Sequence, residues 1–260
     1  MNTGSLPMSR RGSSVRRIPT LLVASLALAA PGARAAAQPA APAAHESAAK
    51  GLTPAQALER LEAGNHRYAN GTPTHPNESA ARRTEQAKGQ HPYAVIVSCA
   101  DSRVPPEIVF DAGLGDLCVI RTAGNRLDDL VLASIEYAVQ HLGTSLVVVL
   151  GHERCGAIAA ALEPAPAHAS PASSEPEPNH VPVLVRTLAD AVTASASMPG
   201  DKAENAMLEN VRIVVRGVTA ESPYLAARAK AGALRVVGAR YDLDTGVVTM
   251  VQPGSPPASK

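Results

Sequence analysis

Two short polar motifs each follow a run of apolar residues, and this arrangement constrains the fold more than any other feature of the chain. Ser98-Cys99-Ala100-Asp101-Ser102-Arg103 ends the run 93–98, and Gly151-His152-Glu153-Arg154-Cys155-Gly156 follows the run 145–150. Short runs that are apolar throughout are typical of parallel strands buried on both faces. Because open α/β folds place their chemistry at the carboxyl ends of such strands, we expect both motifs to lie in one crevice.

Strand-like and helix-like segments alternate along the chain. We expect strands at 93–98, 117–121, 145–150, 235–241 and 246–251, and helices starting at Thr53-Pro54 and at Asp128-Asp129 and covering 155–162, 183–197 and 202–219. The last of these helices contains Glu209-Asn210-Val211. Alternation of this kind requires right-handed crossovers, so it predicts an α/β fold with a mainly parallel central sheet and flanking helices.

The spacing of apolar residues predicts which helix faces are buried. Leu58, Leu61 and Tyr68 form a stripe on the first helix, which needs a surface to lie against, either its own sheet or a partner subunit. On the helix that starts at Asp128-Asp129, four apolar residues should line the inner face: Leu130, Ile135, Ala138 and Leu142.

Residues 1–35 have the three parts of an export signal. A cluster of arginines comes first, residues 21–30 are apolar, and Ala33-Arg34-Ala35 is a cleavage site. The apolar run of about ten residues is shorter than the roughly 20 needed to cross a bilayer. We therefore expect cleavage near Ala36, by the Sec or the twin-arginine route, and a periplasmic or secreted protein without a membrane span.

The mature chain then divides into three parts. Residues 36–50 are rich in Ala and Pro and lack apolar periodicity, as expected of a linker. Residues 51–252 are long enough for one catalytic domain, interrupted by an exposed Pro-rich loop at 164–182. Residues 253–260 form a tail that we expect to be disordered.

Composition excludes several partners. The formal net charge is +1, Trp is absent and Phe occurs once. The chain thus lacks both the basic footprint and the aromatic platforms of nucleic-acid binding, so we expect a small-molecule partner. Three cysteines are an odd number, which argues against a disulfide framework and leaves two free to hold a metal; for Cys118, inside the second strand, we expect a core role.

The two motifs together predict a zinc site. Zinc prefers sulfur and nitrogen donors, so Cys99, His152 and Cys155 form a plausible set of three ligands. The His-x-x-Cys spacing suits a turn that enters a helix, where the helix N-terminus favours the thiolate form of Cys155. Water in an open fourth position would have its pKa lowered toward about 7, which gives a hydroxide nucleophile at neutral pH.

Asp101 and Arg103 lie in the same loop as Cys99. Two thiolates weaken the Lewis acidity of zinc, and a hydrogen bond from the bound hydroxide to Asp101 would counter this, with Arg103 holding the carboxylate. Without Arg103, Asp101 could become a fourth zinc ligand and close the site. Whether the resting site is open or closed is not determined at this level.

Cys-x-Asp-x-Arg after one strand and Gly-His-x-x-Cys-Gly after another resemble the β-class carbonic anhydrases, in a bacterial, exported form. The similarity spans residues 52–251 and includes Arg121-Thr122-Ala123-Gly124-Asn125 and Gly238-Ala239-Arg240-Tyr241-Asp242. It implies a β-carbonic anhydrase-like sheet with the C-terminal strand added at the edge. It also implies a zinc lyase that reversibly hydrates CO2 to bicarbonate and a proton by attack of zinc-bound hydroxide.

The same resemblance assigns roles to residues. Cys99, His152 and Cys155 would hold one Zn²⁺ per chain, and Asp101 and Arg103 would orient the hydroxide. Two groups would bind substrate, the Gln90 side chain and the Gly156 backbone N–H. Members of the family form homodimers in which the N-terminal helices wrap the partner, and these often pair into tetramers.

Some members of the family also have a second, inhibitory bicarbonate pocket. Arg121 and Tyr241 occupy two of its positions in this chain, but Ile96 stands where the family has a Trp. We therefore do not expect allosteric inhibition of that kind.

Two other functions fit some of the same residues. A non-catalytic zinc-binding or bicarbonate-binding module would need neither Asp101 nor Arg103, and both are present. A thiol enzyme using Cys99 or Cys155 with His152 would contain a reactive thiolate instead of a metal, so alkylation distinguishes it from a zinc enzyme.

Overall fold

The structure is a computed structural model that describes residues 51–163 and 180–253. The expected export signal, the linker and most of the Pro-rich loop and the tail lie outside the described residues, so those assignments stay predictions. Within the part that is described, every helix is too short or too polar to span a membrane.

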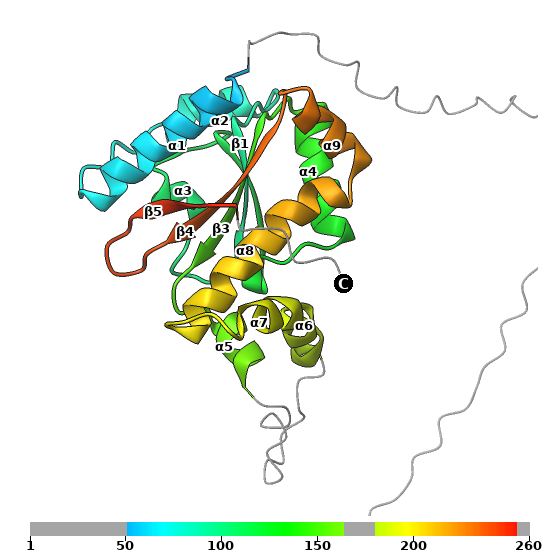
Figure 1. The fold of residues 1–260 in the computed structure, drawn as a ribbon. Coiled ribbons are helices and arrows are strands. Elements are labelled where there is room, and N and C mark those ends of the chain that lie inside the picture. Colours follow the sequence, from blue (N-terminus) through cyan, green and yellow to red (C-terminus); the bar gives the residue numbers. More distant parts are fainter. Residues whose placement is uncertain (1–50, 164–179, 254–260) are drawn as a thin grey trace, which may run out of the picture. The chain divides into compact units, whose positions relative to one another are not determined.

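A five-stranded sheet with the order β2-β1-β3-β4-β5 organises the domain (Figure 1). The strands are β1 Ala94–Cys99, β2 Leu117–Thr122, β3 Leu146–His152, β4 Arg235–Tyr241 and β5 Val248–Val251. The first four are parallel, and β5 pairs antiparallel with β4 at the edge. The expected fold class is confirmed, although β1 extends beyond its apolar run to include Cys99, and β3 extends beyond its run to include Gly151 and His152.

Both faces of the sheet are buried, because alternate residues of each strand point to opposite sides. Val95 and Val97 of β1 pack with α4 (Asp129–His141) and α8 (Lys202–Ala220), and α9 (Pro223–Lys230) lies on the same side. Ala94 and Ile96 pack with α1 (Pro54–Ala69) and α3 (Pro106–Val109) on the other. Figure 1 shows these two layers, with α5 (Gly156–Leu162) beyond the end of β3.

Helix α1 starts where the sequence predicts. Thr53 is its N-cap and forms a capping box with Gln56, which satisfies two backbone donors of the first turn. Leu58 and Leu61 are buried against the chain's own sheet, and Tyr68 is partly buried there. The sequence allowed the apolar stripe of α1 to pack against its own sheet or against a partner subunit. In the structure it packs against the sheet, so α1 needs no partner subunit to cover it.

The predicted inner face of α4 is wrong at Leu130, which is 79% exposed. The buried residues of this helix are Val131, Ile135, Ala138 and Val139. Residues 131, 135 and 138 have the spacing of one helix face, and Leu130 is about 100° away from Val131. The apolar pattern allowed either residue, and packing against the sheet selected Val131.

Several other element boundaries differ from the prediction. The helix expected at 183–197 is two helices, α6 (Val181–Thr187) and α7 (Ala189–Ser195), which meet at the fully buried Leu188. The expected loop 164–182 therefore ends earlier, since Val181 and Pro182 are helical. Helices α2 (Ala80–Gln86), α3 and α9 were not predicted, because four to eight residues are too few to show a helical period.

Candidate metal centre

The order of the strands brings the two polar motifs together. From β1 the chain crosses first to β2 on one side and later to β3 on the other, so the direction of winding reverses at β1. The crevice outside the carboxyl ends of two such strands is where open α/β sheets bind ligands. Cys99 ends β1, His152 ends the neighbouring β3, and Cys155 is the N-cap of α5.

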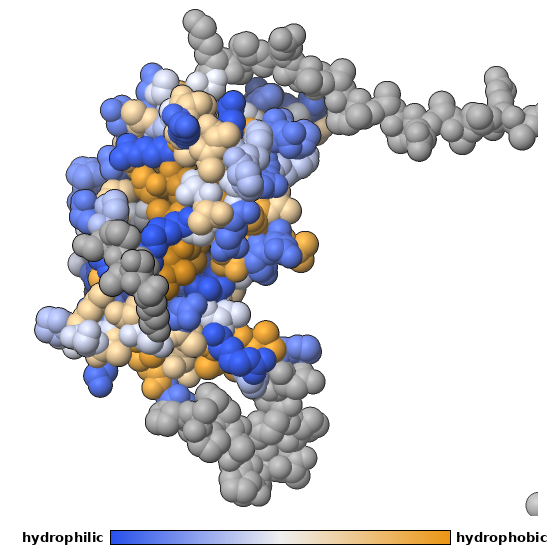
Figure 2. All heavy atoms as spheres, turned by 45° about the vertical axis from the view of Figure 1, so that its right-hand side comes forward, coloured by the Kyte–Doolittle hydropathy of each residue, from blue (hydrophilic) through white to orange (hydrophobic). Residues whose placement is uncertain are grey.

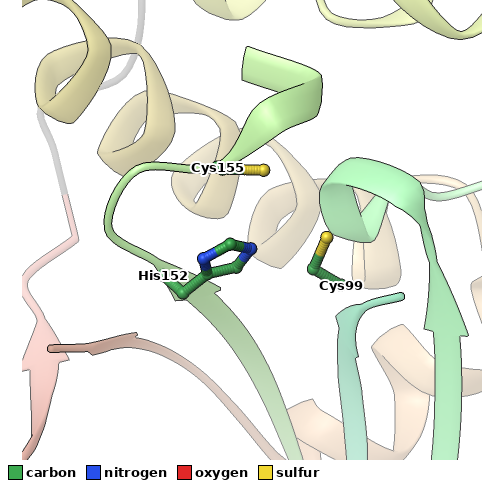
Figure 3. A group of neighbouring side chains, drawn as sticks. All are labelled: Cys99, His152 and Cys155. Atoms are coloured by element: carbon green, nitrogen blue, oxygen red, sulfur yellow. The ribbon is translucent and has the colours of Figure 1, made fainter. Parts of the chain in front are cut away.

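The side chains of Cys99, His152 and Cys155 point toward one common space (Figure 3). The two sulfur atoms and a ring nitrogen all lie within 4.8 Å of one another. The three residues are 5%, 0% and 4% exposed. Folding alone therefore places the three predicted ligands within reach of a single ion.

The hydrogen bond at the His152 ring leaves one nitrogen available. Nδ1 lies 2.8 Å from the carbonyl oxygen of Glu153, and since a carbonyl only accepts, Nδ1 carries the proton. Nε2 then has a free lone pair, and it is buried without a hydrogen-bond partner among the described residues. An unpartnered buried acceptor is costly, and metal-ligating histidines commonly donate their other N–H to a carbonyl in this way.

The two thiols compete for protons. The Cys155 side chain beside Cys99 lowers the pKa of Cys99, and Cys99 in turn raises the pKa of Cys155, so the metal-free pair retains one proton. Burial by itself lowers the pKa of His152, but its interactions with Cys99, the Glu153 carbonyl and Asp101 together outweigh burial and raise it. A divalent cation resolves this competition, because two thiolates neutralise Zn²⁺ and a neutral imidazole adds no charge. The donor set therefore fits zinc.

Asp101 lies beside this centre and is held by Arg103. The Arg103 backbone N–H and Nε each donate to Oδ1 at 2.9 Å, and Nη2 donates to Oδ2 at 2.7 Å. These bonds lower the pKa of Asp101 to about 2, so the carboxylate is ionised at neutral pH. Its Oδ2 lies 3.8 Å from Nε2 of His152, next to the space that the three ligands face.

Arg121 is a residue whose part in the site the sequence did not suggest. Its Nε donates to the carbonyl of Cys99 at 2.9 Å and its Nη2 to that of Asp101 at 2.5 Å, which fixes the loop between them. Of the other two positions of the inhibitory pocket, Tyr241 forms a 3.0 Å hydrogen bond with Tyr68, and Ile96 is fully buried. The side chains of Arg121 and Tyr241 are thus hydrogen-bonded within the fold, and that of Ile96 is part of the core.

The two predicted substrate-binding groups lie at opposite ends of the sheet. Gly156 directly follows Cys155 and starts α5, so its backbone is at the crevice. Gln90 is exposed and precedes β1, whereas Cys99 ends that strand. The six residues of β1 alone span about 17 Å, so Gln90 is not brought to the metal centre of its own chain.

An apolar groove elsewhere contains none of the candidate site residues. It lies between α8 and strands β4 and β5, and Val211, Val215 and Val251 are among the residues that line it. Figure 2 shows hydrophobic side chains gathered among hydrophilic ones on one face of the molecule. The candidate site is marked by its donor atoms and not by this groove.

Comparison with known proteins agrees with this site. The family model described as "Carbonic anhydrase" matches residues 94–248. A protein named "Carbonic anhydrase 2" from Mycobacterium tuberculosis is 40% identical over 193 residues, which cover 74% of this chain and 90% of that protein. A carbonic anhydrase from Mycolicibacterium smegmatis is 38% identical over 203 residues, with coverages of 76% and 93%.

Solved structures show the same fold. One of two tetrameric β-carbonic anhydrases from the ascomycete Sordaria macrospora superposes with a TM-score of 0.57 at 22% identity, covering 76% of this chain and 98% of that one. A β-carbonic anhydrase from Coccomyxa, in complex with acetazolamide, has a TM-score of 0.55 at 28% identity, with coverages of 75% and 86%.

Proposed function

The chain belongs to the β-class carbonic anhydrases, and from that membership we propose that it catalyses a zinc-dependent, reversible hydration of CO2 to bicarbonate and a proton. Carbonic anhydrases are lyases, and CO2 hydration is the reaction of the family. One observation supports the zinc requirement above all. Two buried thiols converge in the crevice with Nε2 of His152, which has no hydrogen-bond partner in residues 51–163 and 180–253, and the ionised Asp101 lies beside them.

Each residue of the site has a distinct task. Zinc bound by Cys99, His152 and Cys155 would supply the Lewis acid that makes water a nucleophile near neutral pH. Asp101 keeps free lone pairs on its oxygens, with which it can accept a hydrogen bond from the attacking water and so orient it. Because Arg103 engages both oxygens, it keeps Asp101 ionised and prevents it from turning onto the metal as a fourth ligand.

Substrate binding by Gln90 requires a second subunit, because Gln90 lies at the other end of β1 from its own metal centre. We propose that the chain forms a dimer, or a tetramer of dimers. Leu130 and Tyr137 of α4 are 79% and 55% exposed, and the edge strand β2 is only half-buried, which supports such an interface. Gly156 remains the second predicted donor to bicarbonate.

Export through residues 1–35 also remains a proposal. In an oxidising compartment the two thiols must be metallated before they are oxidised, and bound zinc would protect them. The mass and N-terminal sequence of the protein recovered from the producing cell test this. A mature chain starting near Ala36 supports export, and an intact N-terminus with the protein in the cytosol contradicts it.

The decisive experiment measures CO2 hydration by stopped flow, together with the zinc content of the same sample. We expect about one zinc per chain and hydration well above the uncatalysed rate. Cys155→Ala should lose both zinc and activity, whereas Asp101→Asn should keep zinc and lose about 10–100-fold in activity. Zinc-loaded wild-type protein that fails to hydrate CO2 at alkaline pH would show that the proposed function is wrong.

A further inference from the structure

Asn210 of α8 is a buried amide that uses both of its ends. It is 1% exposed, its Nδ2 donates to the carbonyl of Gly124 at 2.8 Å, and its Oδ1 accepts from Nη1 of Arg126 at 3.0 Å. The proposed function gives Asn210 no part, and among the described residues it forms no hydrogen bond to the three metal-ligand side chains. Its hydrogen bonds reach the site through Gly124.

Gly124 connects Asn210 to the metal centre. While its carbonyl is held by Asn210, its N–H donates to the sulfur of Cys99 at 3.3 Å. One residue is therefore fixed at its acceptor end by α8 and points its donor end at a ligand atom. A small displacement of this residue moves the donor away from the sulfur.

The turn that contains Gly124 is not one that the backbone adopts readily. Gly124 has a φ of 69° and Asn125, which follows it, a φ of 43°, so two successive residues are left-handed. A Cβ at Gly124 would lie 3.3 Å from side-chain atoms of Ala157 and Leu188, tighter than an ordinary contact. Such a conformation persists only where surrounding contacts hold it, and the bond from Asn210 is one of them.

A hydrogen bond to a thiolate draws electron density away from the sulfur. This matters here because two thiolates together weaken the Lewis acidity of the ion they hold. Backbone N–H groups of Ala157 and Ile158 act on Cys155 in the same sense, but those are fixed by helix α5 itself. On the Cys99 side, the Gly124 donor depends on a contact between distant parts of the chain.

We propose that Asn210 is a positioning residue of the metal centre: it holds Gly124 so that the Gly124 N–H stays on the Cys99 sulfur, and thereby limits the electron density that Cys99 donates to the metal. This rests on the proposed zinc site. It assigns a role to the Glu209-Asn210-Val211 segment that acts through a hydrogen bond to a ligand and not through contact with substrate.

The test uses Asn210→Asp, which keeps the size of the side chain and the acceptor for Arg126 but removes the donor to Gly124. Asn65→Asp is the matched control. Asn65 is a buried amide of α1, 6% exposed, whose Nδ2 donates to the carbonyls of Val109 and Gly246. It lies on the other face of the sheet, so the control removes the same kind of bond without touching the metal centre.

Two measurements report on the metal centre without measuring hydratase activity. In the cobalt-substituted protein, we expect Asn210→Asp to shift the thiolate-to-cobalt charge-transfer band to longer wavelength, because a sulfur that loses a donor is easier to oxidise. In the zinc-loaded protein, we expect release of zinc to a chelator to be about 10-fold faster, because Cys99 is held less firmly in its ligand position and this outweighs the stronger donation by its sulfur. Asn65→Asp should leave both unchanged, although each variant should unfold at lower denaturant concentration.

The outcomes separate the two proposals. Asn210→Asp protein with the wild-type band and release rate contradicts the positioning role, as does an equal shift in Asn65→Asp. Wild-type protein that binds no zinc and shows no thiolate-to-cobalt band contradicts the proposed function itself. If Asn210→Asp does not fold, Arg126→Met is the second variant, because it removes the bond that orients the Asn210 amide. We expect its charge-transfer band to move to longer wavelength and its zinc release to be about 3-fold faster. An Arg126→Met protein with the wild-type band and release rate contradicts the role.

Discussion

Two buried polar clusters of this domain differ in how their groups are satisfied. Asp111 and Asp116, in the segment before β2, have all their oxygens supplied with protein donors. Asp111 accepts from the side chains of Arg67 and Thr74 and from two backbone N–H groups, and Asp116 accepts from Arg60, from Asn77 and from a backbone N–H.

The metal centre is incomplete by comparison. Nε2 of His152 has no partner among the described residues, and the two buried thiols retain one proton between them, because the pKa of Cys99 is lowered and that of Cys155 is raised. Folding alone satisfies the hydrogen-bonding groups of the carboxylate cluster formed by Asp111 and Asp116, whereas the metal centre needs an ion to do so. A buried cluster with unsatisfied hydrogen-bonding groups therefore indicates a ligand-binding or catalytic site more reliably than a buried charge does.

Removal of the metal tests this contrast most directly and should have the largest effect. A chelator strong enough to strip zinc should reduce hydratase activity to the uncatalysed rate, and added zinc should restore it. The far-UV circular dichroism should change little, because the apolar core and the carboxylate cluster remain intact. Full activity in verified metal-free protein would mean that the centre is complete without an ion.

Loss of Arg103 should have the next largest effect. Arg103→Met removes the bonds that hold Asp101, and we expect kcat/KM to fall about 10–100-fold while zinc stays bound. Arg154→Met is the control, because Arg154 is an exposed arginine next to the same crevice whose side chain binds Asp244 and not Asp101. Equal losses in the two variants would indicate a general charge effect.

Asp111→Asn should affect stability and not the activity of the folded protein. Burial by itself raises the pKa of Asp111, but hydrogen bonds from Thr74, Arg67 and His75 outweigh burial and hold the pKa below its usual range. Because the folded-state pKa is depressed, this contribution to stability is complete above the unfolded value of about 4 and is lost as the pH falls below it.

Urea unfolding at several pH values measures this contribution. At pH 7 we expect the variant to be less stable than the wild type by about 2 kcal/mol. The difference in the free energy of unfolding should shrink progressively below pH 4, because the contribution of the ionised Asp111 to the stability of the wild type is lost there. A difference that stays constant down to pH 2 would argue that Asp111 is not held as an anion.

Cys118 should show the smallest effect. It lies half-buried in β2, away from the other two thiols, and burial raises its pKa. We expect Cys118→Ala to keep zinc and activity and to change the free energy of unfolding by less than about 1 kcal/mol.

In zinc-loaded protein, mass spectrometry after alkylation should find Cys99 and Cys155 unmodified; stoichiometric trapping of either would instead favour a thiol enzyme.

Features encoded in short stretches of sequence were predicted well. Thr53 and Pro54 predicted the start of α1, and strand β4 has the predicted bounds Arg235–Tyr241. The meeting of Cys99 with His152 followed from the apolar runs before them, since parallel strands that are neighbours bring their ends to one edge. Asp101 and Arg103 are only two residues apart, so their pairing was also a local feature.

Features that depend on distant contacts were not predicted. The phase of α4 was wrong at Leu130, because both Leu130 and Val131 are apolar and only packing distinguishes them. The sequence gives no sign that Asn210 meets Gly124, 86 residues away.

The sequence by itself therefore determined the class of fold, the donor atoms and the metal they suit, because periodicity, capping and ligand chemistry are properties of a few neighbouring residues. Only the tertiary structure decided which polar atoms are satisfied and which are left for a ligand. The balance of donors and acceptors in a buried site depends on every segment packed around it. Here the Glu153 carbonyl, the Gly124 N–H and the Asn210 amide complete the surroundings of His152 and Cys99. Only Nε2 of His152 is left without a partner there, within the part of the chain that the structure describes.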